Sequence, residues 1–321
     1  MRNRVGVVFG ALVAGVLVVS CTGNVGDSGG GDSKKLVLIP GVADEPFYIS
    51  MQCGAEAKAE ELGYELSTQA PTKFDAAQQT PVLSGVVSNK PGGILIAPTH
   101  ATAMASPMKQ ARDAGIKIIE VDTALDDTSV ALSSIASDNT KGGELAARTL
   151  AKLIGDKGPV LVINTKAGTS TTDARAQGFE AAVKAFPGIT SLGVQYNNNE
   201  AAQAASIVTA TLAAHPDLAG IFATNLSSAE GAATGLRNAN KLGQVKLVGF
   251  DASPKQVEDL KAGTVQALIA QDPAGIGAQG VEQAAAALEG KPVTRTLRTD
   301  MVAITQSDMD ANAKYFYKRK C

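Results

Sequence analysis

Short apolar runs recur along this chain and alternate with longer segments that have helical spacing. Each run has the length of a buried strand. The segments between them are rich in Ala, Lys and Glu, and several end at a glycine, which favours the end of a helix. The apolar runs lie at residues 36–40, 64–68, 93–98, 117–122, 159–165, 192–196, 220–225, 246–251 and 266–272.

This alternation predicts an α/β fold in which parallel sheets are covered by helices on both faces. Because the runs are too many for one comfortable sheet, we expect two Rossmann-like lobes. A further short run at residues 133–138 lies near the middle of the strand count. It could carry the chain from one lobe to the other.

The composition is that of a globular protein with a real core. Of the 321 residues, 45% are hydrophobic and 19% are charged, which is unlike a disordered chain. The net charge of −2 provides no basic surface, so no nucleic-acid partner is expected. Since aromatic residues make up only 4% of the chain and none is Trp, ligand stacking would depend on a few Phe and Tyr rings.

The first residues predict an exported protein. After a basic start, residues 5–19 are apolar but too short for a stable membrane span. Together with Cys21 they resemble the lipobox of bacterial lipoproteins, whose cysteine is lipidated. We therefore expect a lipoprotein signal peptide (1–20), a flexible Gly/Ser-rich tether (21–35), and a lipid anchor that holds the protein at the extracytoplasmic face of the cell membrane. The alternative is an ordinary secretory signal with an incidental cysteine.

Two further cysteines, Cys53 and Cys321, are candidates for a disulfide. Paired cysteines outside the cytosol are usually bonded. Cys321 follows the aromatic residues 315–317, which could dock a C-terminal tail. A bond to Cys53 would fix that tail near the first helix. The alternative is two free thiols, one buried and one at a frayed terminus.

Polar and aromatic residues gather where the predicted strands end. Ligands of open α/β sheets bind beyond the carboxyl ends of the strands, so these residues would share one cleft. A single Asp or Asn in such a place could be no more than a helix N-cap, but several in corresponding places favour a pocket. The residues are Asp44, Glu45, Phe47, Tyr48, Asp122, Asn225, Phe250, Asp251, Gln271 and Asp272.

These side chains suit a ligand that carries many hydroxyl groups. Asp and Asn can bind pairs of hydroxyls, and aromatic rings pack on the C–H face of a sugar. Arg175, where a loop enters a helix, would add charge-assisted hydrogen bonds unless it is a surface charge. Because buried charges cost free energy until a ligand or partner satisfies them, such a cleft would close when filled.

Six blocks of the sequence carry a family resemblance. They are ADEPFYISMQCGAEAKAEELGY (43–64), SSIASDNTKGGELAA (133–147), AGTSTTDARAQGF (167–179), LAAHPDLAGIFATN (212–225), LVGFDASP (247–254) and IAQDPAGIGAQGVE (269–282). In this order they resemble the periplasmic sugar-binding proteins of ribose-binding type, the type 1 solute-binding components of ABC importers. The similarity extends from about residue 36 to about residue 302.

The resemblance implies ligand-binding roles for residues of both lobes. The rings of Phe47 and Tyr48 would stack on the sugar from the first lobe, and the ring of Phe250 from the second. Hydrogen bonds would come from both lobes and from a hinge strand. The residues that would make them are Asp122 in the first lobe, Arg175, Asn225 and Asp251 in the second, and Gln271 on the hinge strand.

Three family contacts are absent from this sequence. The usual Arg after the first-lobe Asp is Thr123, a frequent Asn after the third strand is Ala97, and the acidic residue after the Asn is Leu226. Glu45 could replace part of this bonding, and Asn199 stands where the family can place another aromatic ring. The sequence therefore does not decide the ligand, which could be ribose, another pentose, a hexose, a deoxy sugar or a polyol.

The resemblance also implies three crossings of the chain between the lobes and a mechanism. A monosaccharide or polyol would bind one lobe, the lobes would close by hinge motion, and the closed form would dock on ABC permease subunits. The alternative is a sugar sensor that presents its ligand to a chemoreceptor or sensor kinase. The lobes would be residues 36–137 with 272–298, and residues 138–271 with 299–321.

Other functions have weaker signals. GIGAQG (275–280) matches a dinucleotide-binding motif, but it does not follow a first strand and fits close helix packing better. His100 and His215 lack neighbouring ligands, so no metal site is expected, although His100 could lie at the cleft rim. No base poised beside a nucleophile can be named, so we expect neither an enzyme nor a cofactor. A repressor would need a helix-turn-helix where the signal and tether stand.

Overall fold

The computed structural model describes residues 1–3, 6 and 32–321. Cys21, together with most of the predicted signal peptide and tether, lies outside the described residues. Within the described part, no helix is both long and apolar enough to cross a membrane.

Six parallel strands form the first sheet, in the order β11–β5–β4–β3–β1–β2. β1 begins at Asp32, so residues 32–35, which the sequence analysis assigned to the tether, belong to the strand, and Lys35 pairs with Glu65. The strands are β1 (Asp32–Ile39), β2 (Glu65–Thr68), β3 (Pro91–Ile96), β4 (Lys117–Val121), β5 (Ser133–Ser137) and β11 (Thr296–Thr299).

The second sheet repeats this arrangement in the order β12–β10–β9–β8–β6–β7, and only β12 runs antiparallel to its neighbour β10. The two orders correspond strand by strand, so β4 of the first sheet and β9 of the second occupy the same place. The strands are β6 (Lys157–Asn164), β7 (Gly188–Tyr196), β8 (Gly220–Ala223), β9 (Lys246–Phe250), β10 (Ala267–Gln271) and β12 (Met301–Thr305).

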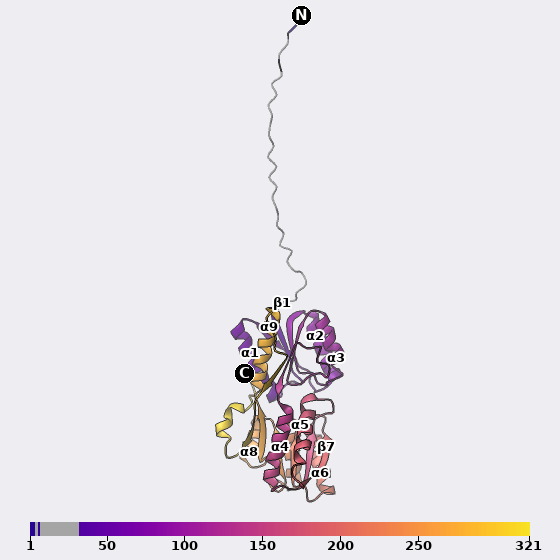
Figure 1. The fold of residues 1–321 in the computed structure, drawn as a ribbon, viewed down its shortest axis with the longest axis vertical. Coiled ribbons are helices and arrows are strands. Elements are labelled where there is room, and N and C mark those ends of the chain that lie inside the picture. Colours follow the sequence, from indigo (N-terminus) through magenta and orange to yellow (C-terminus); the bar gives the residue numbers. More distant parts are fainter. Residues whose placement is uncertain (4–5, 7–31) are drawn as a thin grey trace. The chain divides into compact units, whose positions relative to one another are not determined.

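Helices cover both faces of each sheet (Figure 1). On the first sheet, α1 and α9 share one apolar cluster and α2 and α3 another; on the second, α4 and α5 lie opposite α6, α7 and α8. The predicted two-lobed α/β class is confirmed. The helices are α1 (Pro46–Leu62), α2 (Ala76–Ser88), α3 (Ala105–Asp113), α4 (Asn139–Ile154), α5 (Ser170–Val183), α6 (Ala201–Ala214), α7 (Leu226–Asn238), α8 (Pro254–Lys261), α9 (Pro273–Leu288) and the 3₁₀ helix η1 (Asp310–Tyr315).

The glycines of the GIGAQG segment serve helix packing. A Cβ on Gly277 of α9 would lie 2.1 Å from the backbone oxygen of Met51 in α1, and a Cβ on Gly54 would lie 2.0 Å from that of Ala274. These helices, distant in sequence, therefore pack backbone against backbone, and their labels stand next to each other in Figure 1. The second lobe uses the same device, because a Cβ on Gly143 of α4 would lie 2.0 Å from the Arg175 oxygen of α5.

The chain passes between the two sheets at three places: after β5, after β10, and between β11 and β12. One residue from each passage meets the others through hydrogen bonds. The Ser137 hydroxyl donates to Gln271 Oε1 over 2.8 Å and lies 3.2 Å from Thr299 Oγ1. All three side chains are buried, so the passages form one hydrogen-bonded junction.

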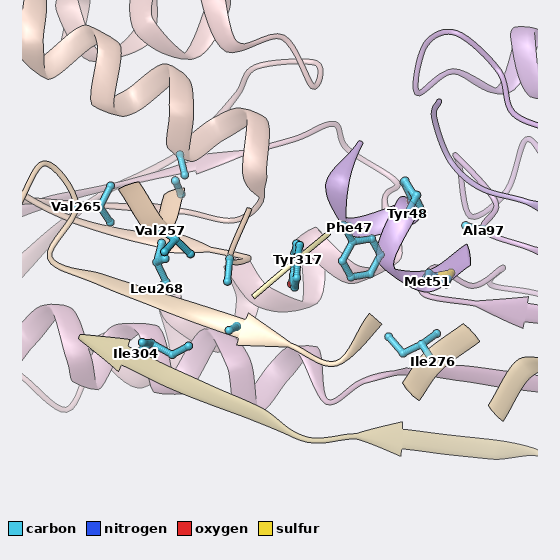
Figure 2. Packing of buried hydrophobic residues seen from close by; sticks show 14 of the residues in the cluster. Phe47, Tyr48, Met51, Ala97, Val257, Val265, Leu268, Ile276, Ile304 and Tyr317 are labelled. Atoms are coloured by element: carbon cyan, nitrogen blue, oxygen red, sulfur yellow. The ribbon is translucent and has the colours of Figure 1, made fainter. Parts of the chain in front are cut away.

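The C-terminal tail adds a covalent link. The structure contains the predicted disulfide between Cys53 and Cys321, whose Cα atoms are 5.2 Å apart. Tyr317, in the same tail, is buried beside Phe47 of α1 (Figure 2). The tail therefore lies against the first helix, as the sequence suggested.

Candidate functional site

A polar cavity lies where the carboxyl ends of the two sheets face each other. Eight of the nine predicted ligand-binding residues line it; Phe250 does not. The lining residues are Glu45, Phe47, Tyr48, Phe74, Asp122, Thr123, Thr165, Thr169, Thr171, Thr172, Arg175, Asn199, Asn225, Asp251 and Gln271.

Two equivalent aspartates form the centre of the site. Asp122 directly follows β4 and Asp251 directly follows β9. Each donates its backbone N–H over 2.8 Å to the neighbouring strand, at Ile135 and Ile269 respectively. Their φ angles are positive, 64° and 79°, in the left-handed region that Asp tolerates better than most residues. Such strain clusters at functional sites, which supports a binding role for both.

The two carboxylates have different surroundings. Asp122 Oδ2 accepts a hydrogen bond from the Tyr48 hydroxyl over 2.9 Å. Asp251 Oδ1 accepts from Gln271 Nε2 over 2.7 Å and from the Tyr317 hydroxyl over 2.9 Å, while its Oδ2 accepts from the Leu226 N–H over 3.1 Å. Asp251 is thus held from three directions.

Arg175 is buried and fixed by neutral oxygens. Its Nε donates to Asn139 Oδ1 over 2.8 Å, and its two terminal nitrogens donate to Thr224 O and Gln271 Oε1 over 2.9 and 3.0 Å. The guanidinium lies 3.7 Å from the centre of the Phe250 ring, a cation–π contact. Its position on the cavity wall is therefore set before any ligand arrives.

Phe250 supports the site from behind and does not line the cavity. Successive residues of a strand point to opposite faces, so Phe250 points into the core between β9 and α4 while Asp251 faces the cavity. Its ring packs beside Phe222 in that core and lies under Arg175. The expected stacking ring of the second lobe is thus a platform for a guanidinium.

Three carboxyl groups share the cavity with one guanidinium. Burial raises the pKa of the half-buried Glu45 to about 8, and the charges of Asp251 and Asp122 add to the shift. Burial also raises the pKa of Asp122 to about 6, although the Arg175 charge opposes the change. At neutral pH, Glu45 is thus mainly a hydrogen-bond donor and Asp122 an acceptor. The cavity suits a neutral ligand with many hydroxyls better than an anion.

A row of threonines forms the wall near the start of α5. Among the described residues, the side-chain hydroxyls of four buried cavity residues have no hydrogen-bond partner: Thr123, Thr165, Thr169 and Thr172. A buried hydroxyl without a hydrogen-bond partner costs free energy. A ligand that hydrogen-bonds to these threonines would remove that cost, which would favour binding. This wall adds neutral hydrogen-bonding groups to the charged ones.

Asn225 is both a helix N-cap and a cavity residue, the two roles considered from the sequence. It is the N-cap of α7, where its Oδ1 accepts from the Ser228 N–H over 3.1 Å, and it also lines the cavity. Its Nδ2 donates to Asn199 Oδ1 over 2.7 Å, which brings Asn199 to the wall. Asp272, by contrast, caps α9 through Gly275 and does not line the cavity.

The two lobes touch across the cavity mouth. Ala101 donates its N–H to Gly168 O over 2.8 Å, and Ala124 donates its N–H to Ser170 Oγ over 2.9 Å. At the edge, Lys166 Nζ lies 3.1 Å from an Asp75 carboxylate oxygen. The described structure is therefore a closed arrangement in which the cavity is covered from both sides.

Several site residues escaped the sequence analysis. Phe74 lies late in the loop between β2 and α2, and Tyr317 belongs to the C-terminal tail. Thr169, Thr171 and Thr172 had a visible signal, because the GTSTT run (168–172) lies in a block that carried the family resemblance. In the part of the chain that the structure describes, no group of three or more His, Cys, Asp or Glu residues is arranged to hold a metal ion.

Two α/β lobes that enclose a polar cavity between the carboxyl ends of their sheets define a two-lobed solute-binding fold. The chain belongs to the periplasmic binding protein family, since residues 36–292 match the periplasmic binding protein domain. This confirms the family resemblance drawn from the six sequence blocks.

Individual relatives narrow the comparison. Over 270 residues the chain is 34% identical to the ribose import binding protein RbsB of Salmonella typhimurium, covering 83% of this chain and 88% of that protein. An ABC transporter solute-binding protein from Agrobacterium vitis, solved with α-D-tagatopyranose, has 44% identity, a TM-score of 0.87 and coverage of 88% and 99%. Another from the same organism, solved with D-fucose, has 27% identity, a TM-score of 0.84 and coverage of 88% and 100%.

Proposed function

We propose that this protein is the extracytoplasmic substrate-binding component of an ABC importer and that it captures a neutral monosaccharide between its lobes. The observation that carries the proposal is the pair of equivalent aspartates, Asp122 and Asp251, one from each sheet, on the wall of one shared cavity. Relatives named for sugar import favour transport over the sensor alternative.

The side chains divide the work of binding. Asp122 and Asp251 accept hydrogen bonds from sugar hydroxyls, and Arg175 and the protonated Glu45 donate them. The ring of Phe47 covers the C–H face of the sugar. Closure buries the ligand and removes water from these polar groups, which strengthens each of their hydrogen bonds.

A hexose is the best candidate ligand. The relative with 44% identity was solved with α-D-tagatopyranose, which makes D-tagatose the first sugar to test. The relatives named for ribose are less similar, at 34% identity or below. Thr123, where the family usually has an arginine, gives a shorter and neutral wall, which favours a ligand larger than ribose.

A thermal-shift screen followed by calorimetry tests the proposal. The compact unit Gly31–Cys321 would be mixed with D-tagatose, D-ribose, D-allose, D-fucose and D-arabinose, with a sugar acid as a charged control. A ligand at one hundred times its Kd stabilises the folded state by about 2.7 kcal/mol, a readily measured rise in Tm. If no sugar raises the Tm or gives binding heat, the proposal is wrong.

We also propose that Cys21 carries a lipid that holds the protein at the outer face of the membrane, and that the closed form docks on permease subunits. Incorporation of labelled palmitate in the full chain, and its loss in Cys21→Ala, would support the anchor. Copurification of permease subunits that depends on the bound sugar would support the docking.

A further inference from the structure

The C-terminal residues 316–321 bind both lobes. On the second lobe, Tyr317 donates its backbone N–H to Ala252 O over 3.0 Å and its hydroxyl to Asp251 Oδ1 over 2.9 Å. This segment therefore reaches the residue that follows β9, the centre of the candidate site.

The same segment is fastened to α1 of the first lobe. The Lys318 N–H donates to Ser50 Oγ over 2.7 Å, and Cys321 is bonded to Cys53. Residues 318–321 are exposed, whereas Tyr317 is buried. An exposed terminus frays unless something holds it, and the disulfide gives this one a covalent attachment to the first lobe.

Tyr317 also connects the two aspartates. Its ring centre lies 5.8 Å from that of Phe47, at an interplanar angle of 65° (Figure 2). Phe47 packs edge-on against Tyr48 at 5.1 Å, and the Tyr48 hydroxyl donates to Asp122. A continuous series of contacts thus runs from Asp251 through the tail to Asp122.

Gln271 and Leu226, the two other donors to Asp251, both belong to the second lobe. The hydroxyl of Tyr317 is the donor that the tail supplies, and it shares Oδ1 with Gln271. Without the Tyr317 hydroxyl, Asp251 Oδ1 would keep Gln271 as its described side-chain donor. The Asp251 carboxylate would then rotate more freely.

We propose that residues 316–321 are a strap for the binding site, in which the Cys53–Cys321 disulfide holds Tyr317 so that its hydroxyl fixes the Asp251 carboxylate for the ligand. Tyr317 does not line the cavity, so it is a positioning residue. This inference rests on the proposed binding of a sugar in that cavity.

The first test removes only the Tyr317 hydroxyl. Tyr317→Phe keeps the ring, the disulfide and the packing on Phe47, and Tyr315→Phe makes the same change two residues away, outside the cavity lining. We expect Tyr317→Phe to raise the calorimetric Kd for the best-binding sugar of the panel about tenfold, the scale of one hydrogen bond to a charged group. Tyr315→Phe should not change it.

The second test opens the strap. Cys53→Ser with Cys321→Ser should also weaken binding, and adding Tyr317→Phe to this pair should weaken it little further, because both changes release the same contact. Opening the disulfide lowers the Tm of the unliganded protein in either case, so the Kd decides. A purely structural role would leave the Kd of the folded fraction unchanged, and that result would overturn the inference.

Amide hydrogen exchange gives a readout that needs no ligand. In the unliganded double-serine variant, the Tyr317 amide, which donates to Ala252, should exchange at least about tenfold faster than in the disulfide-bonded protein, since local opening sets such rates. Unchanged exchange would show that the disulfide does not hold the tail and would overturn the inference.

The outcomes also separate the two claims. If the disulfide-bonded protein binds no sugar, the proposed function fails, and the strap is judged by exchange alone. If it binds sugar and Tyr317→Phe binds equally well, sugar binding stands and the positioning role is wrong.

Discussion

Replacing Asp122 with Asn tests the first-lobe half of the proposed site with little disturbance. Asn has nearly the same shape and also tolerates the left-handed backbone, so the φ of 64° adds no new strain. The Asn carbonyl oxygen can still accept the Tyr48 hydroxyl that Asp122 Oδ2 now accepts over 2.9 Å. What the change removes is the negative charge and one acceptor.

The expected loss of binding free energy follows from removing the negative charge and the acceptor. A hydrogen bond to a charged group contributes about 1.5–3 kcal/mol and a neutral one about 0.5–1.5 kcal/mol. Exchanging one for the other should weaken sugar binding by about 1–2 kcal/mol, or about five- to thirtyfold in Kd at pH 7.5. Because burial raises the pKa of Asp122 to about 6, the difference from Asn should shrink at pH 5, where Asp122 is protonated and neutral.

Titration calorimetry at both pH values measures this difference. Asp156→Asn is the matched control, because Asp156 also has a positive φ, 58°, but is exposed and does not line the cavity. Asp122→Ala should in addition lower stability by about 1–2 kcal/mol, since Ala is strained in the left-handed region. A Kd for Asp122→Asn equal to that of the unsubstituted protein at pH 7.5 would refute the assignment.

Four further outcomes are expected. Burial raises the pKa of Glu45 from 4.5 to about 8, so the folded protein keeps a proton that the unfolded chain releases, and the contribution of Glu45 to stability falls as the pH rises from 4.5 to 8. Gln does not titrate, so the Tm of unliganded Glu45→Gln minus that of the unsubstituted protein should increase from pH 5 to pH 8.5. A constant Tm difference would contradict the pKa shift. Lys166→Met removes a half-exposed ion pair with Asp75 at the cavity edge, so it should weaken sugar binding less than about fivefold, and less still at high salt. Gly143→Ala places a Cβ 2.0 Å from the Arg175 oxygen and should destabilise the protein by about 1–3 kcal/mol in denaturant unfolding, whereas Gly85→Ala, on an open helix surface, should be neutral or stabilising. Asp251→Asn should lower the Tm more than Asp122→Asn does. The reason is that Asp251 accepts three hydrogen bonds inside the protein, whereas Asp122 Oδ2 accepts one from Tyr48. Equal Tm values for the two variants would contradict this difference between the aspartates.

The fold could be predicted because its signal is local and repeated. Most strands are apolar runs, the helices have their own spacing, and the number of runs indicated two sheets. The edge strands β11 (Thr296–Thr299) and β12 (Met301–Thr305) were not among the predicted runs. The strand endings at Asp122 and Asp251 could be found for the same reason, since parallel strands bring their carboxyl ends to one edge. The start of β1 was missed because Asp32, Ser33, Lys34 and Lys35 are polar, although the backbone pairs there.

The remaining site residues depend on long-range contacts that no local pattern contains. Phe250 and Asp251 are adjacent in sequence but point to opposite sides at the end of β9. Phe250 therefore lies in the core, whereas Asp251 lines the cavity. Tyr317 is 66 residues from Asp251 and lies in the tail that ends at the disulfide-bonded Cys321. The aromatic run and Cys53 predicted docking of the tail near the first helix, but the contact of Tyr317 with Asp251 could not be predicted.

The two lobes have equivalent aspartates, yet the surrounding hydrogen bonds give them different parts in closure. Asp251 is held by Gln271, by the start of α7 and by the tail, so it is ready in one orientation before a ligand arrives. Asp122 has the single described donor Tyr48 and a raised pKa, so it is the carboxylate that gains more from a ligand hydroxyl. A sugar would therefore be oriented by the second lobe, and the unmet hydrogen bonding of the first would favour the closed state once the sugar is in place.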